Sequence, residues 1–175
     1  MTAADIAGAR ELPHRYAAAI DAGDIDGAAA LFALDAELLL PEPPGQLEPI
    51  TTHRGRAEIR QALSSVLDVR ATLHEITGQV LEALGLDRAS GRITGVAHHY
   101  LDHPEHSAHS EHSAHSAHSE RPGAARDLVW RIRYDDEYVR TEGHWLIASR
   151  SLTVLAIELN EVRAILPRKG LPLIP

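Results

Sequence analysis

The sequence predicts an α+β fold in which helices near the N-terminus cover one face of a curved, mainly antiparallel sheet. Two observations predict it. Apolar residues recur at the helical spacing of three to four as far as residue 68, and from Thr72 onward they alternate with the period of two that is typical of strands. The 175 residues, of which 44% are hydrophobic, fit one globular domain, which we assign to residues 1–160.

The N-terminal segment predicts two helices. Residues 12–22 place Leu12, Tyr16 and Ile20 on one helical face, and a glycine then ends the helix. Asp24 follows as the N-cap of a second, short helix, because its carboxylate can accept a hydrogen bond from an unpaired N–H of the first turn.

A break, a short strand and a third helix come next. Asp35 marks the break before a short apolar strand. Residues 41–55 contain so much Pro and Gly that we expect no regular structure there. Residues 55–68 predict a third amphipathic helix, whose apolar stripe consists of Ile59, Leu63, Val66 and Leu67.

Four long strands are expected after the helices, separated by turn-like or polar segments: residues 72–84, 90–101, 127–139 and 144–158. The alternation is clearest in the third of them. There Trp130, Ile132 and Tyr134 point to one face of the sheet. Arg131 and Arg133 point to the other.

Residues 103–120 form a low-complexity insertion between two strands, in which a histidine recurs at every third position. Neutral imidazole is a good ligand for zinc, nickel and copper, so we expect adventitious binding of divalent metal here but no dedicated metal site. We favour a tolerated solvent loop, since lengthening a surface loop costs little free energy. The proline-rich tail, residues 161–175, is expected to be an extended arm.

Composition excludes several classes of function. The absence of cysteine excludes disulfide frameworks, zinc ribbons and thiol nucleophiles. A formal net charge of −8 without a basic cluster argues against nucleic acid as a partner, because phosphate binding depends on Lys and Arg. We see neither a signal peptide nor an apolar run long enough to span a membrane, so we expect no membrane partner and a cytoplasmic protein.

Without cysteine, a nucleophile or general base must be a carboxylate or an imidazole. His74 stands in an otherwise apolar or neutral strand, on a face shared with Thr72, Ile76 and Val80. A lone histidine in a strand is more often a hydrogen-bonded core residue than a base, so it needs a partner. Asp21 is the candidate, because it lies at the end of a helix, where a carboxylate is slightly unfavourable against the helix dipole. We expect the Asp21 carboxylate about 2.6 to 3.2 Å from a His74 ring nitrogen.

Four segments, in their order along the chain, resemble the SnoaL-like branch of the nuclear transport factor 2-like superfamily: residues 16–40, 53–63, 72–80 and 134–154. The most specific is the strand, acidic turn and Trp-led strand from Tyr134 to Arg150. The resemblance extends over residues 12–157 without the histidine repeat. It implies a cone-shaped, strongly bent sheet wrapped by three helices, with a deep apolar pocket open at one end.

The resemblance also implies roles for individual residues. Dehydratases and dehydrochlorinases of this branch use an aspartate near the end of the first helix, a histidine early in the first long strand and an arginine in the last strand. Asp21, His74 and Arg150 match these positions, and Tyr16 matches a polar residue of the first helix. We therefore expect His74 to take a proton from carbon while Asp21 fixes its tautomer. Arg150 would stabilise negative charge that develops on a carbonyl or a leaving group, and Tyr16 would donate a hydrogen bond to the same oxygen or protonate a departing hydroxyl.

Three further residues are expected to bind substrate. His98 or His99 falls near an additional polar pocket residue of scytalone dehydratase-like and bile-acid dehydratase-like proteins, with a register uncertain by one residue. Trp130 is the third.

These residues favour a dehydratase-like lyase or isomerase, without cofactor or catalytic metal, that acts on a small, largely apolar hydroxylated or carbonyl compound. A polyketide cyclase-like enzyme is an alternative, as is a non-catalytic module that binds a small ligand or another subunit, because the fold alone does not decide function. We also expect a homodimer formed through the sheet, since both faces of residues 127–134 carry large side chains.

Overall fold

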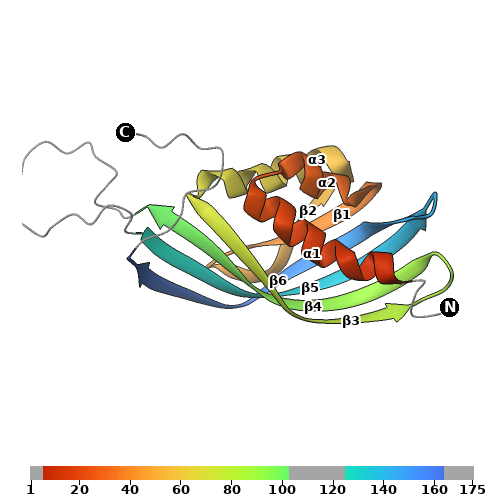
Figure 1. Cartoon of the computed structure of the whole chain (residues 1–175). Helices are drawn as coiled ribbons and strands as arrows, with labels where there is room; N and C mark the ends of the chain where they lie inside the picture. Colours follow the sequence, from red (N-terminus) through yellow and green to blue (C-terminus); the bar gives the residue numbers. More distant parts are fainter. Residues whose placement is uncertain (1–5, 103–124, 164–175) are drawn as a thin grey trace, which may run out of the picture.

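In the part of the chain that the structure describes, three helices lie against one face of a six-stranded sheet, which confirms the predicted α+β arrangement (Figure 1). The computed structural model describes residues 6–102 and 125–163. The histidine insertion at 103–120 and the tail from residue 164 lie outside the described residues. Among the described residues, no helix is long and apolar enough to cross a membrane.

The helices are α1 (Ala7–Ala22), α2 (Ile25–Ala30) and α3 (Gly55–Leu63), and α3 continues into a 3-10 turn, η1 (Ser64–Asp68). The strands are β1 (Phe32–Glu42), β2 (Gln46–Arg54), β3 (Ala71–Ala83), β4 (Arg88–Asp102), β5 (Ala125–Thr141) and β6 (His144–Val162). Their order in the sheet is β2-β1-β6-β5-β4-β3. Every neighbouring pair is antiparallel except β1 and β6, which run parallel.

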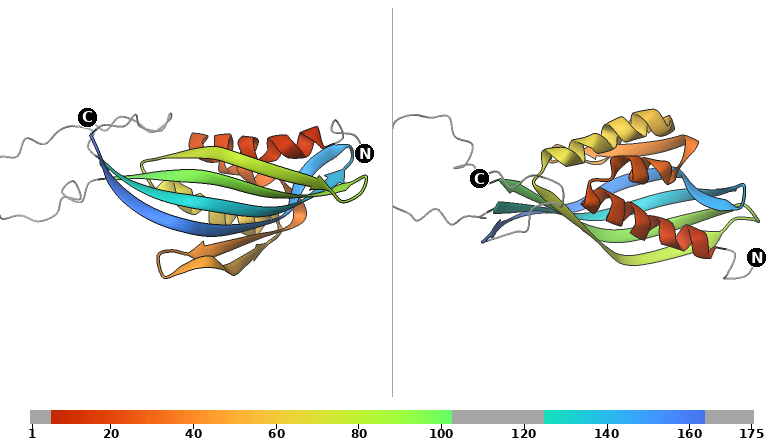
Figure 2. Two further views of the ribbon diagram at one scale, coloured as in Figure 1. Left: turned by 90° about the horizontal axis from the view of Figure 1, so that it is seen from below. Right: turned by 45° about the horizontal axis from the view of Figure 1, so that its top comes forward.

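Long strands bend around the helices. Figure 2 shows α1, α2 and α3 on the same side of the curved sheet. The buried apolar side chains of the described residues gather between the helices and this concave face, with Phe32, Ile59, Ile93 and Ile147 at 0% exposure. Burying this apolar surface is the main force that holds the helices on the sheet.

The end of α1 is fixed by two capping devices. Gly23 adopts a left-handed conformation with φ of 72°, and its N–H donates to the carbonyl of Ile20 at 2.9 Å. Asp24 then caps α2 as predicted, because its carboxylate accepts the Gly27 N–H at 2.8 Å. These caps hold the last turn of α1, which carries Asp21, in one place over the sheet.

The third helix is shorter than predicted. It ends at Leu63 instead of residue 68, and a 3-10 turn follows. The Ser64 and Ser65 hydroxyls donate to carbonyls three residues earlier, and such local hydrogen bonds compete with α-helical ones. Leu67, which we placed on the apolar stripe, is 50% exposed as a result.

The expectation of irregular structure at 41–55 was wrong, because β2 occupies most of that segment. β2 is an edge strand and has a neighbouring strand on one side only. Pro49 is tolerated in it, because the N–H that proline lacks need not pair with a second neighbour. Asp35 does not break the chain either. It lies inside β1 and is exposed at a shift in the register between β1 and β6, which falls between Phe32 and Glu37.

A bulge in β3 changes which residues face the helices. The pairing of β3 with β4 shifts between Ile76 and Gly78, so the side-chain alternation reverses beyond that point. Val80, which we placed on the face of His74, is therefore 74% exposed. Leu81 takes the inward position and packs against the core. His74 precedes the bulge and keeps its inward orientation.

Candidate functional site

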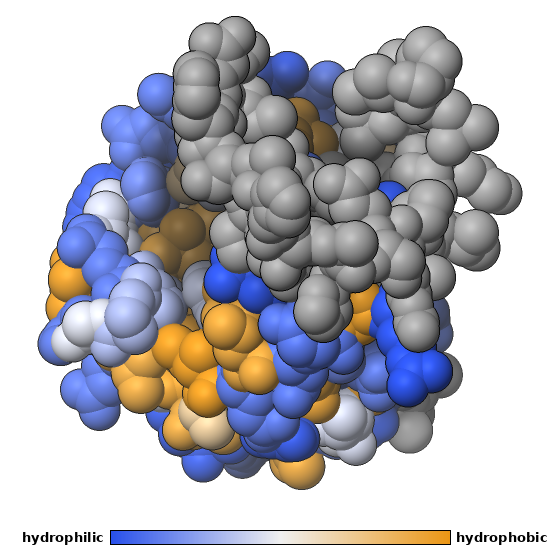
Figure 3. All heavy atoms as spheres, turned by 90° about the vertical axis from the view of Figure 1, so that its left-hand side faces the viewer, coloured by the Kyte–Doolittle hydropathy of each residue, from blue (hydrophilic) through white to orange (hydrophobic). Residues whose placement is uncertain are grey.

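A cavity of about 330 Å³ lies between the helices and the concave face of the sheet. Most of its described lining is apolar; the polar lining side chains are Tyr16, Ser65, His74, His99 and Tyr134. No Lys, Arg, Asp or Glu belongs to that described lining. Figure 3 views the molecule from the end where α3 and the C-terminal part of β6 lie, and apolar side chains gather there around a hollow. The cavity thus suits an uncharged, largely apolar molecule.

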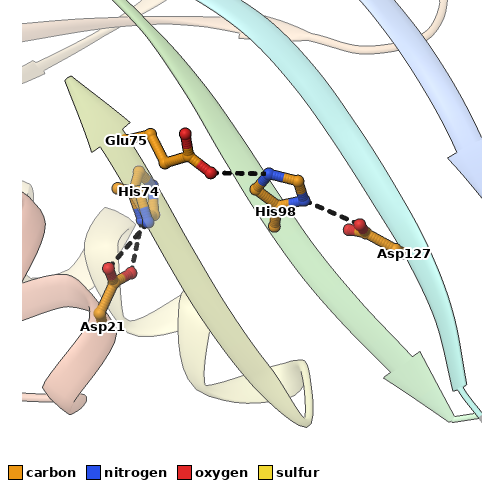
Figure 4. A network of polar contacts seen from close by, with 5 residues as sticks. All are labelled: Asp21, His74, Glu75, His98 and Asp127. Carbon is orange, nitrogen blue, oxygen red and sulfur yellow. Dashed lines mark hydrogen bonds and ion pairs between the residues drawn. The ribbon is translucent and has the colours of Figure 1, made fainter. Parts of the chain in front are cut away.

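Asp21 and His74 form the hydrogen-bonded pair that the sequence predicts (Figure 4). One Asp21 oxygen lies 2.7 Å from His74 Nδ1, and the other accepts the backbone N–H of His74 at 2.8 Å. Both contacts come from one carboxylate at the end of α1, so its orientation relative to β3 is fixed. The side chains are 20% and 8% exposed.

The carboxylate also fixes the tautomer of the histidine. Burial by itself raises the pKa of Asp21, but hydrogen bonds from the His74 ring, the His74 backbone and Thr72 outweigh it, and the pKa lies below its ordinary value. Asp21 is therefore ionised at neutral pH and can only accept, so His74 Nδ1 carries the proton. His74 Nε2 has no hydrogen-bond partner among the described residues.

His99 is the histidine of β4 that lines the cavity. Its Nδ1 donates to the carbonyl of Leu128 at 3.1 Å, which leaves Nε2 as an acceptor. Burial lowers the pKa of His99, so the ring is neutral at pH 7. Its centre lies 6.1 Å from that of His74 and 4.6 Å from that of Trp130, which also lines the cavity. Two imidazoles, those of His74 and His99, therefore share one wall.

His98 points to the opposite face of the sheet, so its assignment as a substrate-binding residue is corrected. Successive strand residues alternate in direction, and the register that the sequence left open is settled in favour of His99. His98 Nδ1 lies 2.7 Å from Asp127, and Nε2 lies 3.5 Å from Glu75 (Figure 4). This cluster has no part in the cavity.

Arg150 lies behind the cavity wall instead of in it. Its Nε and Nη2 donate to the two oxygens of Asp136 at 2.9 and 2.6 Å, and both side chains are 0% exposed. The guanidinium carbon lies 4.4 Å from the ring centre of Tyr16 and 4.2 Å from that of Tyr134. These two rings line the cavity and Arg150 does not, so this arrangement does not place Arg150 in direct contact with a bound molecule.

The surroundings keep Arg150 charged and the phenols of Tyr16 and Tyr134 neutral. Burial alone would lower the pKa of Arg150, but the Asp136 carboxylate outweighs it and the pKa is raised. Burial raises the pKa values of Tyr16 and Tyr134. Both phenols therefore keep their protons at neutral pH and can donate hydrogen bonds.

Asp136 is the residue of this region that the sequence reasoning missed. A signal for it existed in the alternation of β5. Tyr134, Asp136 and Tyr138 fall on the same, inward face, and a carboxylate at a buried position requires a partner. That partner is Arg150, directly across the strand pair, and the Tyr138 hydroxyl donates to the same carboxylate at 2.7 Å.

Within residues 6–102 and 125–163, no group of three or more His, Asp or Glu side chains is arranged to hold a metal ion. The histidine repeat, on which we expect adventitious metal binding, lies outside these ranges.

A family model described as the SnoaL-like domain matches residues 1–151. The chain belongs to this SnoaL-like family. The predicted resemblance is thereby confirmed, and with it the bent α+β fold of the nuclear transport factor 2-like superfamily. No curated protein matches the SnoaL-like chain at the sequence level.

Solved structures share the fold over nearly their whole length. A candidate scytalone dehydratase from Novosphingobium aromaticivorans is 20% identical, with a TM-score of 0.66 and coverage of 94% of this chain and 93% of that one. Hexachlorocyclohexane dehydrochlorinase LinA-type3 from Novosphingobium barchaimii is 17% identical, with a TM-score of 0.68 and coverage of 94% and 95%. A candidate aromatic ring hydroxylase from Novosphingobium aromaticivorans is 21% identical, with a TM-score of 0.67 and coverage of 93% and 96%. At these identities the likeness establishes the fold.

Proposed function

We propose that this SnoaL-like protein is a cofactor-independent lyase or isomerase that acts on a small, largely apolar compound with a hydroxyl or carbonyl group. The observation that carries the proposal is the 2.7 Å contact between Asp21 and His74 at the wall of a cavity without formally charged lining residues. An oriented imidazole with one unpaired nitrogen is the arrangement that general-base catalysis needs. Two of the similar structures are named for elimination reactions, a dehydratase and a dehydrochlorinase, which agrees with this chemistry.

His74 Nε2 would remove a proton from the carbon next to a carbonyl group. The electron pair of that C–H bond forms a C=C bond while the C–O bond at the next carbon breaks. Asp21 stabilises the imidazolium that results, because its carboxylate faces the other nitrogen. The departing hydroxide takes a proton from the imidazolium and leaves as water, or it takes one from the Tyr16 hydroxyl, in which case the proton on the imidazolium then restores the phenol. In an isomerisation the imidazolium returns the proton to a different carbon of the same molecule.

Proton exchange at carbon tests the base without knowledge of the natural substrate. The full chain would be incubated in D₂O with a panel of small cyclic β-hydroxyketones. NMR would follow loss of the α-proton signal, and ultraviolet absorbance would follow formation of the enone. We expect catalysed exchange, with elimination for the compounds that fit. His74→Ala should lower the rate by about 10² to 10⁴ fold, as removal of a positioned base usually does.

His98→Asn is the matched control, because His98 also pairs with a carboxylate at 2.7 Å but faces away from the cavity. This variant should retain the exchange rate of the unmodified protein. Equal rates in the His74→Ala variant and the unmodified protein would contradict the proposal. In that case the non-catalytic ligand-binding interpretation takes its place.

A further inference from the structure

A fully buried ion pair lies one layer of side chains behind the cavity. Arg150 and Asp136 are each 0% exposed at their side chains, and the guanidinium of Arg150 packs against the rings of Tyr16 and Tyr134, which line the cavity. Neither member of the pair gives or takes a proton in the transfer proposed above. Its charges are nevertheless close enough to act on whatever the cavity holds, because buried charges are little screened by solvent.

Asp136 is the carboxylate that balances Arg150. It accepts two donors of the guanidinium, and the hydroxyl of Tyr138 donates to it as well. The third nitrogen of the guanidinium, Nη1, has no hydrogen-bond partner among the described residues. The groups that pack against Arg150 from α1 and β5 are otherwise the neutral phenols of Tyr16 and Tyr134. The charge of Arg150 is thus cancelled by a single residue.

We propose that Asp136 is a specificity-determining residue: by cancelling the charge of Arg150 it makes the cavity select uncharged ligands over anions of the same shape. With Asp136 in place the guanidinium charge is balanced, and the Asp21 carboxylate, which is bound to the lining residue His74, repels anions. Without it, a buried cation would lie directly behind two lining rings, and its attraction for an anion in the cavity would be strong in this poorly solvated region. The inference rests on the proposed function only in taking the cavity as the ligand site.

The ligand class follows from this balance. A ketone, alcohol or ester can leave water for the apolar cavity without stranding a charge, whereas a carboxylate or phosphate ester cannot. The reacting end of the substrate is therefore an uncharged hydroxy or carbonyl compound. An apolar cavity without any charge behind it would also reject anions. The test is therefore whether the preference for uncharged ligands over anions changes when Asp136 alone loses its charge.

Two probes of nearly the same shape, 2-acetylnaphthalene and 2-naphthoate, separate charge from size. Their dissociation constants would be measured by equilibrium dialysis at pH 7.5 with the full-length protein. The unmodified protein should bind the ketone at least about tenfold more tightly than the carboxylate. In Asp136→Asn this ratio should fall by about tenfold or more, because the carboxylate gains affinity. Asp135→Asn is the matched control, since Asp135 pairs with Arg92 and Arg133 on the opposite face of the sheet and should leave the ratio unchanged.

A second variant keeps the inference falsifiable if Asp136→Asn does not fold. In the double variant Asp136→Asn with Arg150→Gln both charges are gone, and the preference for the ketone should persist. Equal binding of both probes by the unmodified protein would overturn the inference. So would an unchanged ratio in a folded Asp136→Asn variant, or loss of the preference in the double variant. The readout is binding, so the inference can stand when no catalysed exchange is found, and it can fail while exchange persists.

Discussion

Removing the charge of Asp136 should also destabilise the protein, and the structure allows an estimate of the amount. Asp136→Asn keeps the shape of the side chain but leaves Arg150 as an uncompensated cation at 0% exposure. Breaking a buried ion pair from one side typically costs about 3 to 5 kcal/mol. The whole free energy of unfolding of a domain is about 5 to 15 kcal/mol, so the variant should remain folded with a small margin. At about 2 to 4 °C per kcal/mol for a chain of this size, its Tm should fall by about 6 to 20 °C.

Urea unfolding followed by circular dichroism would measure the loss. Asp135→Asn serves as the comparison, because Asp135 and its partners Arg92 and Arg133 are at least one-third exposed, and such pairs contribute about 0 to 1 kcal/mol. The double variant Asp136→Asn with Arg150→Gln should lose less unfolding free energy than the two single variants lose together, because no unpaired charge stays buried in it. A loss below about 1 kcal/mol for Asp136→Asn would refute the reasoning, because it would mean that Arg150 finds other compensation.

Two further predictions concern the dyad and the outer face of the sheet. The pKa of Asp21 is lowered in the folded protein, so this carboxylate adds stability that is present above its unfolded pKa and is lost as the pH falls through the folded value. Asp21→Asn should reduce the dependence of the urea midpoint on pH under acidic conditions, whereas Asp68→Asn in η1 should leave that dependence unchanged. If the Asp21→Asn variant and the unmodified protein show the same dependence at acid pH, this linkage is excluded. We also propose that the face of the sheet bearing Arg131 and Arg133, which no helix among the described residues covers, forms a homodimer. Light scattering at tens of micromolar should then give twice the 19.1 kDa of the chain, and a monomer at that concentration would remove the idea.

Local periodicity explains which parts of the fold the sequence could predict. The helices and the long strands could be predicted because the spacing of apolar residues that marks a helix or a strand is visible within a short stretch of sequence. β2 was missed because its formation depends on pairing with β1, and an edge position tolerates the Pro49 that argued against a strand. The outward direction of Val80 depends on the bulge between Ile76 and Gly78, which arises from pairing with β4 and has no signature in β3 alone.

The candidate site shows the same division. The pairing of Asp21 with His74 could be expected because both residue types occur at matching places along the chain. The position of Arg150 was also expected, but its surroundings were not. They depend on the register between β5 and β6, which places Asp136 directly opposite Arg150. Similarly, only the observed strand register decides that His99 enters the cavity and His98 does not.

The two carboxylates of the concave side bear on the proposed proton transfer in different ways. In the proposed transfer His74 would become positively charged, and Asp21 would favour that charge, because no other cation among the described residues pairs with this carboxylate. Arg150, behind the same cavity, would oppose a second positive charge if its own were left uncompensated. Asp136 removes this opposition by binding both Nε and Nη2 of the guanidinium. In the proposed transfer the buried pair would therefore add no net positive charge behind the cavity, and Tyr16, whose ring lies between Arg150 and the cavity, would remain a neutral donor.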